Sequence, residues 1–91
     1  MSQPAHKIRF GNLSVTIWRN VHSEKGSVWY TLDPTRGYKQ GDETWRETSS
    51  LGADDALIMA ELLRQAFGWI SKQMQADAKA RKAKQEANSD E

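Results

Sequence analysis

The chain has 91 residues, contains no cysteine, and carries 13 basic against 12 acidic residues, for a net charge of +1. A chain of this length forms one domain with a small core, and neither disulfides nor a thiolate metal site can support that core, so we expect self-association as a homodimer. The near-neutral charge argues against a general duplex-DNA binder.

The sequence shows no segment typical of export or membrane insertion. Residues 1–7 lack the apolar core of a signal peptide. No stretch approaches the roughly 20 apolar residues that span a bilayer. We therefore expect a soluble, cytoplasmic protein without a membrane partner, whose residues 1–6 form a flexible N-terminus.

Apolar and polar residues alternate from residue 7 to residue 18, with one interruption at Gly11 and Asn12. Gly followed by Asn suits a two-residue hairpin turn, because such turns need positive φ. Closing the hairpin there pairs Phe10 with Leu13 and separates an apolar face from a polar one. A single longer strand with a bulge at the glycine is the alternative.

A third alternating segment, residues 27–32, follows a polar loop. Pro34 is expected either to end the regular ladder or to lie at an edge of the sheet, because proline cannot donate a hydrogen bond to the ladder. Residues 36–42 then read as a turn-rich connection, and residues 43–49 as a fourth strand. The sequence does not assign the inward face of that last strand, so the position of Trp45 stays open.

A helix start follows, where Asp54 and Asp55 are interpreted as capping residues at the positive end of the helix dipole. From there an apolar stripe recurs at helical spacing. Its members are Met59, Leu62, Leu63, Ala66, Phe67, Ile70 and Met74. Trp69 is interpreted as a core or interface residue. Beyond the stripe, residues 75–91 are expected to form a charged tail, partly helical and then disordered.

The sequence therefore predicts an α+β fold of one domain, residues 7–74. Four antiparallel strands are followed by one long C-terminal amphipathic helix, in the order β-β-β-β-α, and the helix packs on one face of the sheet. Because one helix covers only one face, the opposite face meets water or a partner.

The sequence contains no recognisable catalytic apparatus. His6 and His22 lie near the terminus and in a loop, without a carboxylate or hydroxyl at the spacing of a metal or nucleophile site, and we interpret them as solvated surface residues. No phosphate-binding glycine loop is present. We therefore expect a non-enzymatic protein with no metal and no cofactor.

The uncovered sheet face is the candidate for function. It carries Trp18 and Trp29 near basic side chains, and unpaired bases stack on aromatic rings while cations contact the phosphates. A basic-aromatic loop and the fourth strand extend the same track. The predicted nucleic-acid contacts are Lys7, Arg9, Trp18, Trp29, Arg36, Tyr38, Lys39, Trp45 and Arg46.

This order of elements resembles the positive-cofactor-four family of single-stranded-DNA-binding transcriptional coactivators and their bacterial and phage relatives, over residues 7–74. Lys7-Ile8-Arg9-Phe10-Gly11 and Trp45-Arg46-Glu47-Thr48 are also similar to the "KIR-x-G" openings and "Trp-x-Glu-Thr" strands of some small bacterial proteins. The resemblance to the coactivators implies a homodimer built through the helices. It also implies curved sheets that present to a single strand Arg9, Trp18, Trp29, Lys39 and Arg46.

We therefore expect binding of single-stranded nucleic acid, DNA rather than RNA, in replication, recombination or transcription in a bacterium or mobile element. The alternative is a protein-interaction or dimerisation module that uses the same Trp/Arg face. Trp18 and Trp29 would then form a cross-strand aromatic pair or the centre of an interface.

Overall fold

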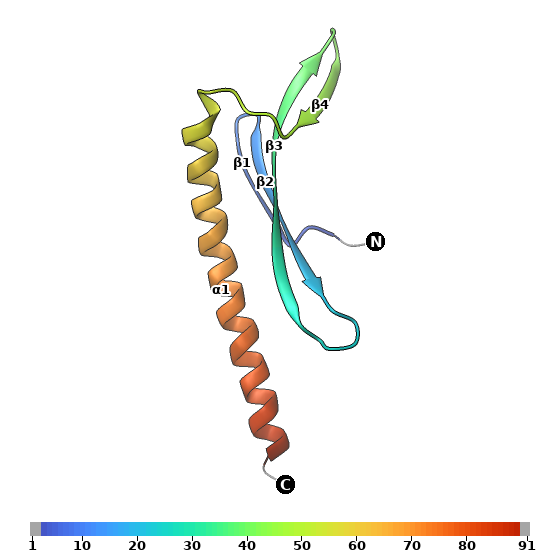
Figure 1. The fold of residues 1–91 in the computed structure, drawn as a ribbon, viewed down its shortest axis with the longest axis vertical. Coiled ribbons are helices and arrows are strands. Elements are labelled where there is room, and N and C mark those ends of the chain that lie inside the picture. Colours follow the sequence, from blue (N-terminus) through green and yellow to red (C-terminus); the bar gives the residue numbers. More distant parts are fainter. Residues whose placement is uncertain (1–2, 90–91) are drawn as a thin grey trace.

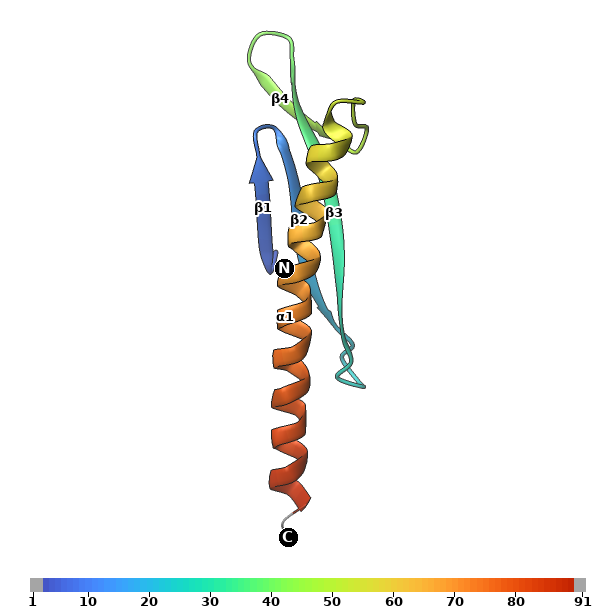
Figure 2. The ribbon, with the colours of Figure 1, turned by 90° about the vertical axis from the view of Figure 1, so that its left-hand side faces the viewer.

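The computed structural model describes residues 3–89, with side chains as far as residue 84. Its elements are β1 (His6–Phe10), β2 (Leu13–Val21), β3 (Val28–Gln40), β4 (Thr44–Thr48) and α1 (Asp55–Ser89). The four strands form one antiparallel sheet in the order β1-β2-β3-β4. The helix lies along one face of it, over β1 and β2 (Figures 1 and 2). The predicted α+β fold is confirmed.

The predicted first hairpin is present with the expected register. Phe10 pairs with Leu13 and Ile8 with Val15. Gly11 has a φ of 61°, which side chains other than glycine rarely tolerate. The turn therefore sits at Gly-Asn, and the alternative of one continuous bulged strand is wrong.

Of the two alternatives for Pro34, the end of the ladder is wrong, because β3 continues through it to Gln40. Gly37 donates its backbone N–H to the carbonyl of Asn12, on the β2 side, at 2.7 Å. Backbone N–H directions alternate along a strand, so the nitrogen of Pro34 faces away from β2. On that side β4 pairs only from Arg36 onward. Proline therefore occupies a free edge and costs no ladder hydrogen bond.

The segment expected to be a turn-rich connection is mostly strand. Residues 36–40 of β3 pair with all of β4, and the turn between them is limited to residues 41–43. The Arg-Gly-Tyr-Lys composition is typical of a loop. In the structure, however, the backbone N–H and C=O groups of this segment and of β4 form hydrogen bonds with each other. This β3–β4 hairpin projects past the start of α1 (Figure 1).

The core lies between β2 and α1 and is formed by seven buried apolar residues. They are Leu13, Val15, Ile17, Met59, Leu62, Ala66 and Ile70, flanked by the half-buried Ile8, Tyr30 and Trp69. The strand residues alternate and the helix residues recur every three or four positions, as both geometries require. Trp69, predicted in the core or an interface, packs against the core.

The predicted helix stripe divides into two. Leu63, Phe67 and Met74 do not join the core, and the last two are 70% and 57% exposed. Successive helix residues are rotated by about 100°, so Phe67 and Met74 lie roughly a quarter turn away from buried Ala66. The apolar arc of α1 is thus wider than the sheet can cover.

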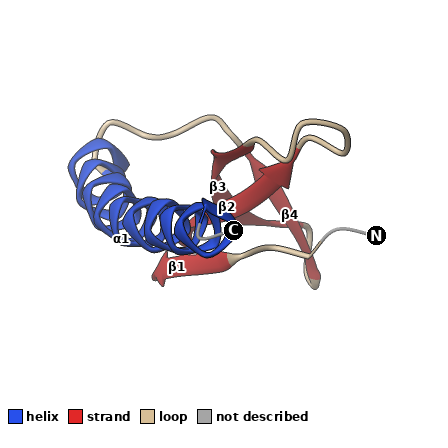
Figure 3. Cartoon of the chain, turned by 90° about the horizontal axis from the view of Figure 1, so that it is seen from below, coloured by secondary structure: helices blue, strands red, loops and turns tan. Residues whose placement is uncertain are grey.

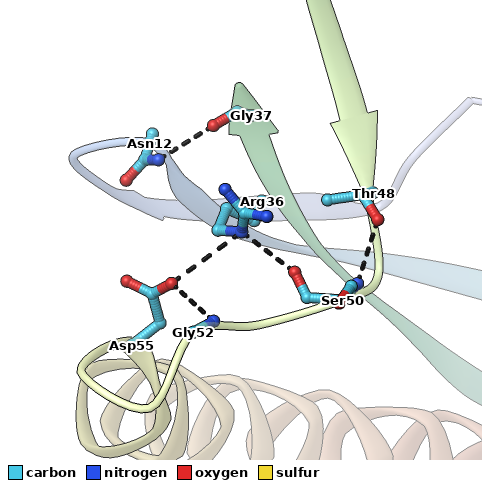
Figure 4. A network of polar contacts seen from close by, with 7 residues as sticks. All are labelled: Asn12, Arg36, Gly37, Thr48, Ser50, Gly52 and Asp55. Atoms are coloured by element: carbon cyan, nitrogen blue, oxygen red, sulfur yellow. Dashed lines mark hydrogen bonds and ion pairs between the residues drawn. The ribbon is translucent and has the colours of Figure 1, made fainter. Parts of the chain in front are cut away.

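The two ends of the docked helix are held by polar contacts. At the start, the Asp55 carboxylate accepts the backbone N–H of Gly52 at 3.0 Å (Figure 4), so of the two predicted capping residues Asp55 bonds a backbone N–H at the helix start. Further along, the hydroxyl of Tyr30 donates to Asp77 at 2.7 Å, and Arg19 approaches the same carboxylate at 3.5 Å. Contact with the sheet therefore continues past residue 74, the predicted domain end.

The backbone of α1 remains helical through the charged segment to Ser89. Residues 90–91, at the end of the expected tail of residues 75–91, lie outside the described residues. None of the helical segments in residues 3–89 is sufficiently long and apolar for a membrane span.

We predict that Tyr30→Phe lowers the free energy of unfolding by about 1 kcal/mol at pH 7, because the Asp77 carboxylate loses a half-buried donor. Urea denaturation measures this. Burial and the bond to Asp77 raise the pKa of Tyr30. The protonated form is therefore favoured in the folded state, so the stabilisation is present below about pH 10 and is lost as the pH rises through the folded pKa.

The difference between the two proteins should accordingly shrink in alkaline solution. Tyr38→Phe is the matched control, because the Tyr38 side chain is exposed and we expect no change. Equal stability of Tyr30→Phe and the unmodified protein would show that the Asp77 contact does not hold the helix.

Candidate nucleic-acid interface

Within residues 3–84 nothing covers the sheet face opposite α1, which is called the open face below. Leu13, Val15 and Ile17 of β2 point toward the helix, so the alternate residues point away from it. Figure 3, viewed along the molecule, shows the single helix on one side of the strands. By register the open face carries Lys7, Arg9, Ser14, Thr16, Trp18, Asn20, Trp29, Thr31, Asp33 and Thr35.

A row of short hydroxyl side chains runs along the middle of the open face. Ser14 lies between Arg9 and Thr35, and its hydroxyl is 2.8 Å from that of Thr35. Thr16 lies between Lys7 and a β3 residue, and both hydroxyl residues of β2 are buried. Because β2 is central, longer side chains of its neighbours flank this row. The two cations of β1 therefore lie along one side of this row of hydroxyl groups. The row and its flanking side chains are called the strip below.

Two tryptophans stand at the far end of this strip. Trp18 is half-buried opposite Thr31, and Trp29 is 48% exposed opposite Asn20. The Asn20 amide donates to the Trp29 carbonyl at 3.4 Å and to the Thr31 hydroxyl at 3.2 Å. In residues 3–84 the paired rings are His6–Trp69 and Tyr30–Trp69. The expected alternative, a Trp18–Trp29 aromatic pair, is thus not among these contacts.

Strand pairing places Trp45 on the open face, which the sequence left undecided. Trp45 lies opposite Lys39, and Glu47 lies opposite Gly37. These residues share the alternation of Thr35 and so point away from the helix side. The Trp45 ring is 66% exposed. Only the length of β3, which passes Pro34, brings this tryptophan beside the first hairpin.

The concavity beside this ring is called the Trp45 pocket. It has a volume of about 490 Å³ and lies between the β1–β2 turn and the β3–β4 hairpin. It is lined by Arg9, Gly11, Asn12, Ser14, Thr35, Gly37, Trp45, Arg46 and Glu47. Sequence reasoning found two of the lining cations and the tryptophan, but it missed Glu47 and Gly37, whose relevance depends on the β3–β4 register.

Three predicted contact residues do not follow the alternation of the open face. Arg36, Tyr38 and Arg46 follow the alternation of the helix side. Arg36 donates from Nε to the Ser50 carbonyl at 2.9 Å and lies 3.8 Å from the Asp55 carboxylate (Figure 4). Its guanidinium also lies 5.8 Å from the centre of the Tyr38 ring. Arg36 therefore organises the helix start, whereas Arg46 lines the Trp45 pocket.

The charges of the open face are weakly positive. Lys7, Arg9 and Lys39 stand against Asp33 and Glu47. Ion pairs within residues 3–84 join Arg19 to Asp77, Arg36 to Asp55, and Arg64 to Glu61. The three cations of the open face are thus without a carboxylate partner in that part of the chain and can contact an external anion.

The two histidines have local structural contacts. His6 is exposed and stacks on Trp69 with ring centres 4.8 Å apart, and His22 Nδ1 accepts the backbone N–H groups of Glu24 and Lys25. The described residues contain no group of three or more metal-ligating side chains of the His, Cys, Asp and Glu types.

We predict that Arg36→Gln lowers the free energy of unfolding by about 1 kcal/mol, because the Ser50 carbonyl and the Asp55 carboxylate lose a shared cation. Arg46→Gln is the control, since Arg46 is exposed and should leave stability unchanged. Thermal denaturation of both variants measures the difference. A larger loss for Arg46→Gln than for Arg36→Gln would contradict this assignment.

Comparison with known proteins identifies no family for this chain. No family model matches the sequence, and no curated protein or solved structure is similar to it. The resemblance in element order to the positive-cofactor-four family stays a prediction, and the geometry of the open face is the basis for assigning a function.

Proposed function

We propose that this protein is a non-enzymatic binder of single-stranded DNA and that the open face is its contact surface. One observation carries the proposal: exposed tryptophan rings and cations without carboxylate partners share one uncovered sheet face. Trp29 and Trp45 are 48% and 66% exposed. Base stacking on such rings contributes about 1–3 kcal/mol per base.

The same arrangement favours a single strand over a duplex. In a duplex the base faces are already stacked, so exposed tryptophan rings gain nothing from it, whereas unpaired bases present free faces. The net charge of +1 is too small for binding driven by phosphate contacts alone. The preference for DNA over RNA is proposed on the resemblance in element order.

The cations extend along the strip beside the rings. Lys7 and Arg9 lie on β1, and Lys39 lies opposite Trp45 at the other end of the face. A strand laid across the sheet would meet cations at its phosphates and tryptophans at its bases. With about three phosphate contacts, the logarithm of affinity should fall with the logarithm of salt concentration with a slope of roughly −2.

We predict that an unstructured oligonucleotide of about 12 nucleotides binds at low salt and quenches tryptophan fluorescence. Trp29→Ala and Trp45→Ala should each weaken binding roughly 5- to 150-fold because a stacked base is lost. Raising the salt concentration fourfold should weaken binding roughly 20-fold. Fluorescence titration at two salt concentrations measures both effects.

Two variants that each remove one positive charge distinguish binding at the open face from a general effect of net charge. Arg9→Gln should reduce affinity and the salt dependence, whereas Arg64→Gln, which removes a cation on the helix surface, should change neither. Absence of binding at low salt would refute the proposal. Binding of a polypeptide with little salt dependence would instead identify the face as a protein-interaction surface.

We also propose that the protein is a homodimer built through the outer stripe of α1, defined as Leu63, Phe67, Met74 and Ala78. A groove of about 370 Å³ beside Phe67 is lined also by Ser71, Met74, Gln75 and Ala78. A two-fold interface requires a patch that is complementary to itself. The projecting Phe67 and the adjacent groove meet this requirement on one helix.

An antiparallel helix pair with its axis near residues 70–71 satisfies the shape of this surface. Phe67 of each copy then faces Met74 of the other, and Leu63 faces Ala78.

We predict that Phe67→Asp weakens dimerisation about 30-fold or more, because a buried aromatic anchor is replaced by a charge. Sedimentation equilibrium measures this. Leu57→Asp is the control: Leu57 is 84% exposed and lies on another side of the helix, so it should leave the dimer intact. A monomeric unmodified protein at micromolar concentration would exclude this interface.

A further inference from the structure

The Trp45 pocket has the form of a site for one planar ring. Trp45 makes one wall, and the hydroxyl groups of Ser14 and Thr35 lie at its base. Gly37 has no side chain beside the tryptophan. A Cβ at this position would lie 3.9 Å from the Trp45 Cε3 atom and 3.6 Å from the Asn12 carbonyl, so the glycine leaves open the space next to the ring.

The walls of the pocket are held together before any ligand enters. The Asn12 amide donates to the Gly37 carbonyl at 2.8 Å (Figure 4), and the Gly37 N–H donates to the Asn12 carbonyl at 2.7 Å. These two bonds tie the β1–β2 turn to the C-terminal part of β3. A preformed site loses little conformational entropy on binding.

The charged residues among the lining are Arg9, Arg46 and Glu47, and of these Arg9 and Glu47 belong to the open face by register. A carboxylate repels phosphate and accepts hydrogen bonds without donating any. In residues 3–84, Glu47 has neither an ion-pair partner nor a side-chain hydrogen bond. Its presence in a nucleic-acid site is therefore favourable only where it faces hydrogen-bond donors of a base.

The edges of the four bases differ in the donors that they present. Guanine presents its ring N1–H and its exocyclic amino group side by side, and the two oxygens of one carboxylate can accept both. Adenine and cytosine present one amino group, and thymine presents one ring N–H. A carboxylate that accepts two bonds from one base thus selects guanine.

We propose that the Trp45 pocket binds a single unpaired guanine of the strand, stacked on Trp45, with its donor edge on Glu47 and the adjoining phosphate near Arg9. This inference rests on the proposed binding of single-stranded DNA. The other tryptophan rings of the open face stack on any base, whereas this pocket gives the surface a preference for guanine at one position.

Competition against a labelled thymidine oligonucleotide of about 12 nucleotides tests the inference. The competitors are the unlabelled thymidine strand and the same strand with one central guanine, adenine or cytosine. We expect the guanine strand to bind roughly tenfold more tightly than the others, the discrimination typical of a two-bond base contact. Glu47→Gln should abolish this advantage without weakening binding of the thymidine strand.

Two further variants separate the pocket from other causes. Gly37→Ala meets only ordinary van der Waals contacts, so it folds, but it fills the floor of the pocket and should also remove the guanine advantage. Glu43→Gln, in the turn of the same hairpin, removes an equal charge outside the pocket and should keep the advantage.

The outcomes distinguish failure of the proposed single-stranded DNA binding from failure of the proposed guanine site. If no oligonucleotide binds at low salt, the proposed function fails. If all four strands compete equally, the function stands and the guanine site is refuted. A guanine advantage that survives both Glu47→Gln and Gly37→Ala also refutes the site, because the preference then arises elsewhere on the surface.

Discussion

The packing of β2 against α1 is the contact on which the rest of the molecule depends. Leu13, Val15 and Ile17 meet Met59, Leu62, Ala66 and Ile70, and these seven residues are the entire buried apolar core of the described chain. Such a core is small for 91 residues. The described chain has one helix, and this helix covers one face of the sheet. The packing that stabilises that face therefore leaves the other face uncovered.

Polar contacts at both ends of the helix support this small core. Arg36 and Asp55 anchor the helix start to β3, and Asp77 receives the Tyr30 hydroxyl more than five turns later. Both contacts involve β3, while the apolar contacts involve mainly β2. The helix is thereby aligned with the long axis of the sheet, and Phe67 and Met74 of its outer stripe remain exposed.

The length of β3 connects the fold to the proposed function. Since Pro34 turns its nitrogen to an unpaired edge, the strand continues and carries the β3–β4 hairpin beyond the end of the helix. Trp45 then lies next to the first hairpin rather than in a distant loop. The β1 cations, the two tryptophans of β2 and β3, and Trp45 thus share one face of the sheet, and the proposed binding of a single strand rests on this arrangement.

Local patterns in the sequence determined the first hairpin, the alternation that puts Lys7, Arg9, Trp18 and Trp29 on one face, and the existence of the helix, because strand and helix periodicity and a Gly-Asn turn act over a few residues. The extent of β3, the side of Trp45, the pairing of Arg36 with Asp55 and the division of the helix stripe were decided only by the tertiary structure. Each depends on which residues meet across long stretches of chain: the edge that receives Pro34, the strand opposite Trp45, and the width of the sheet beneath the helix.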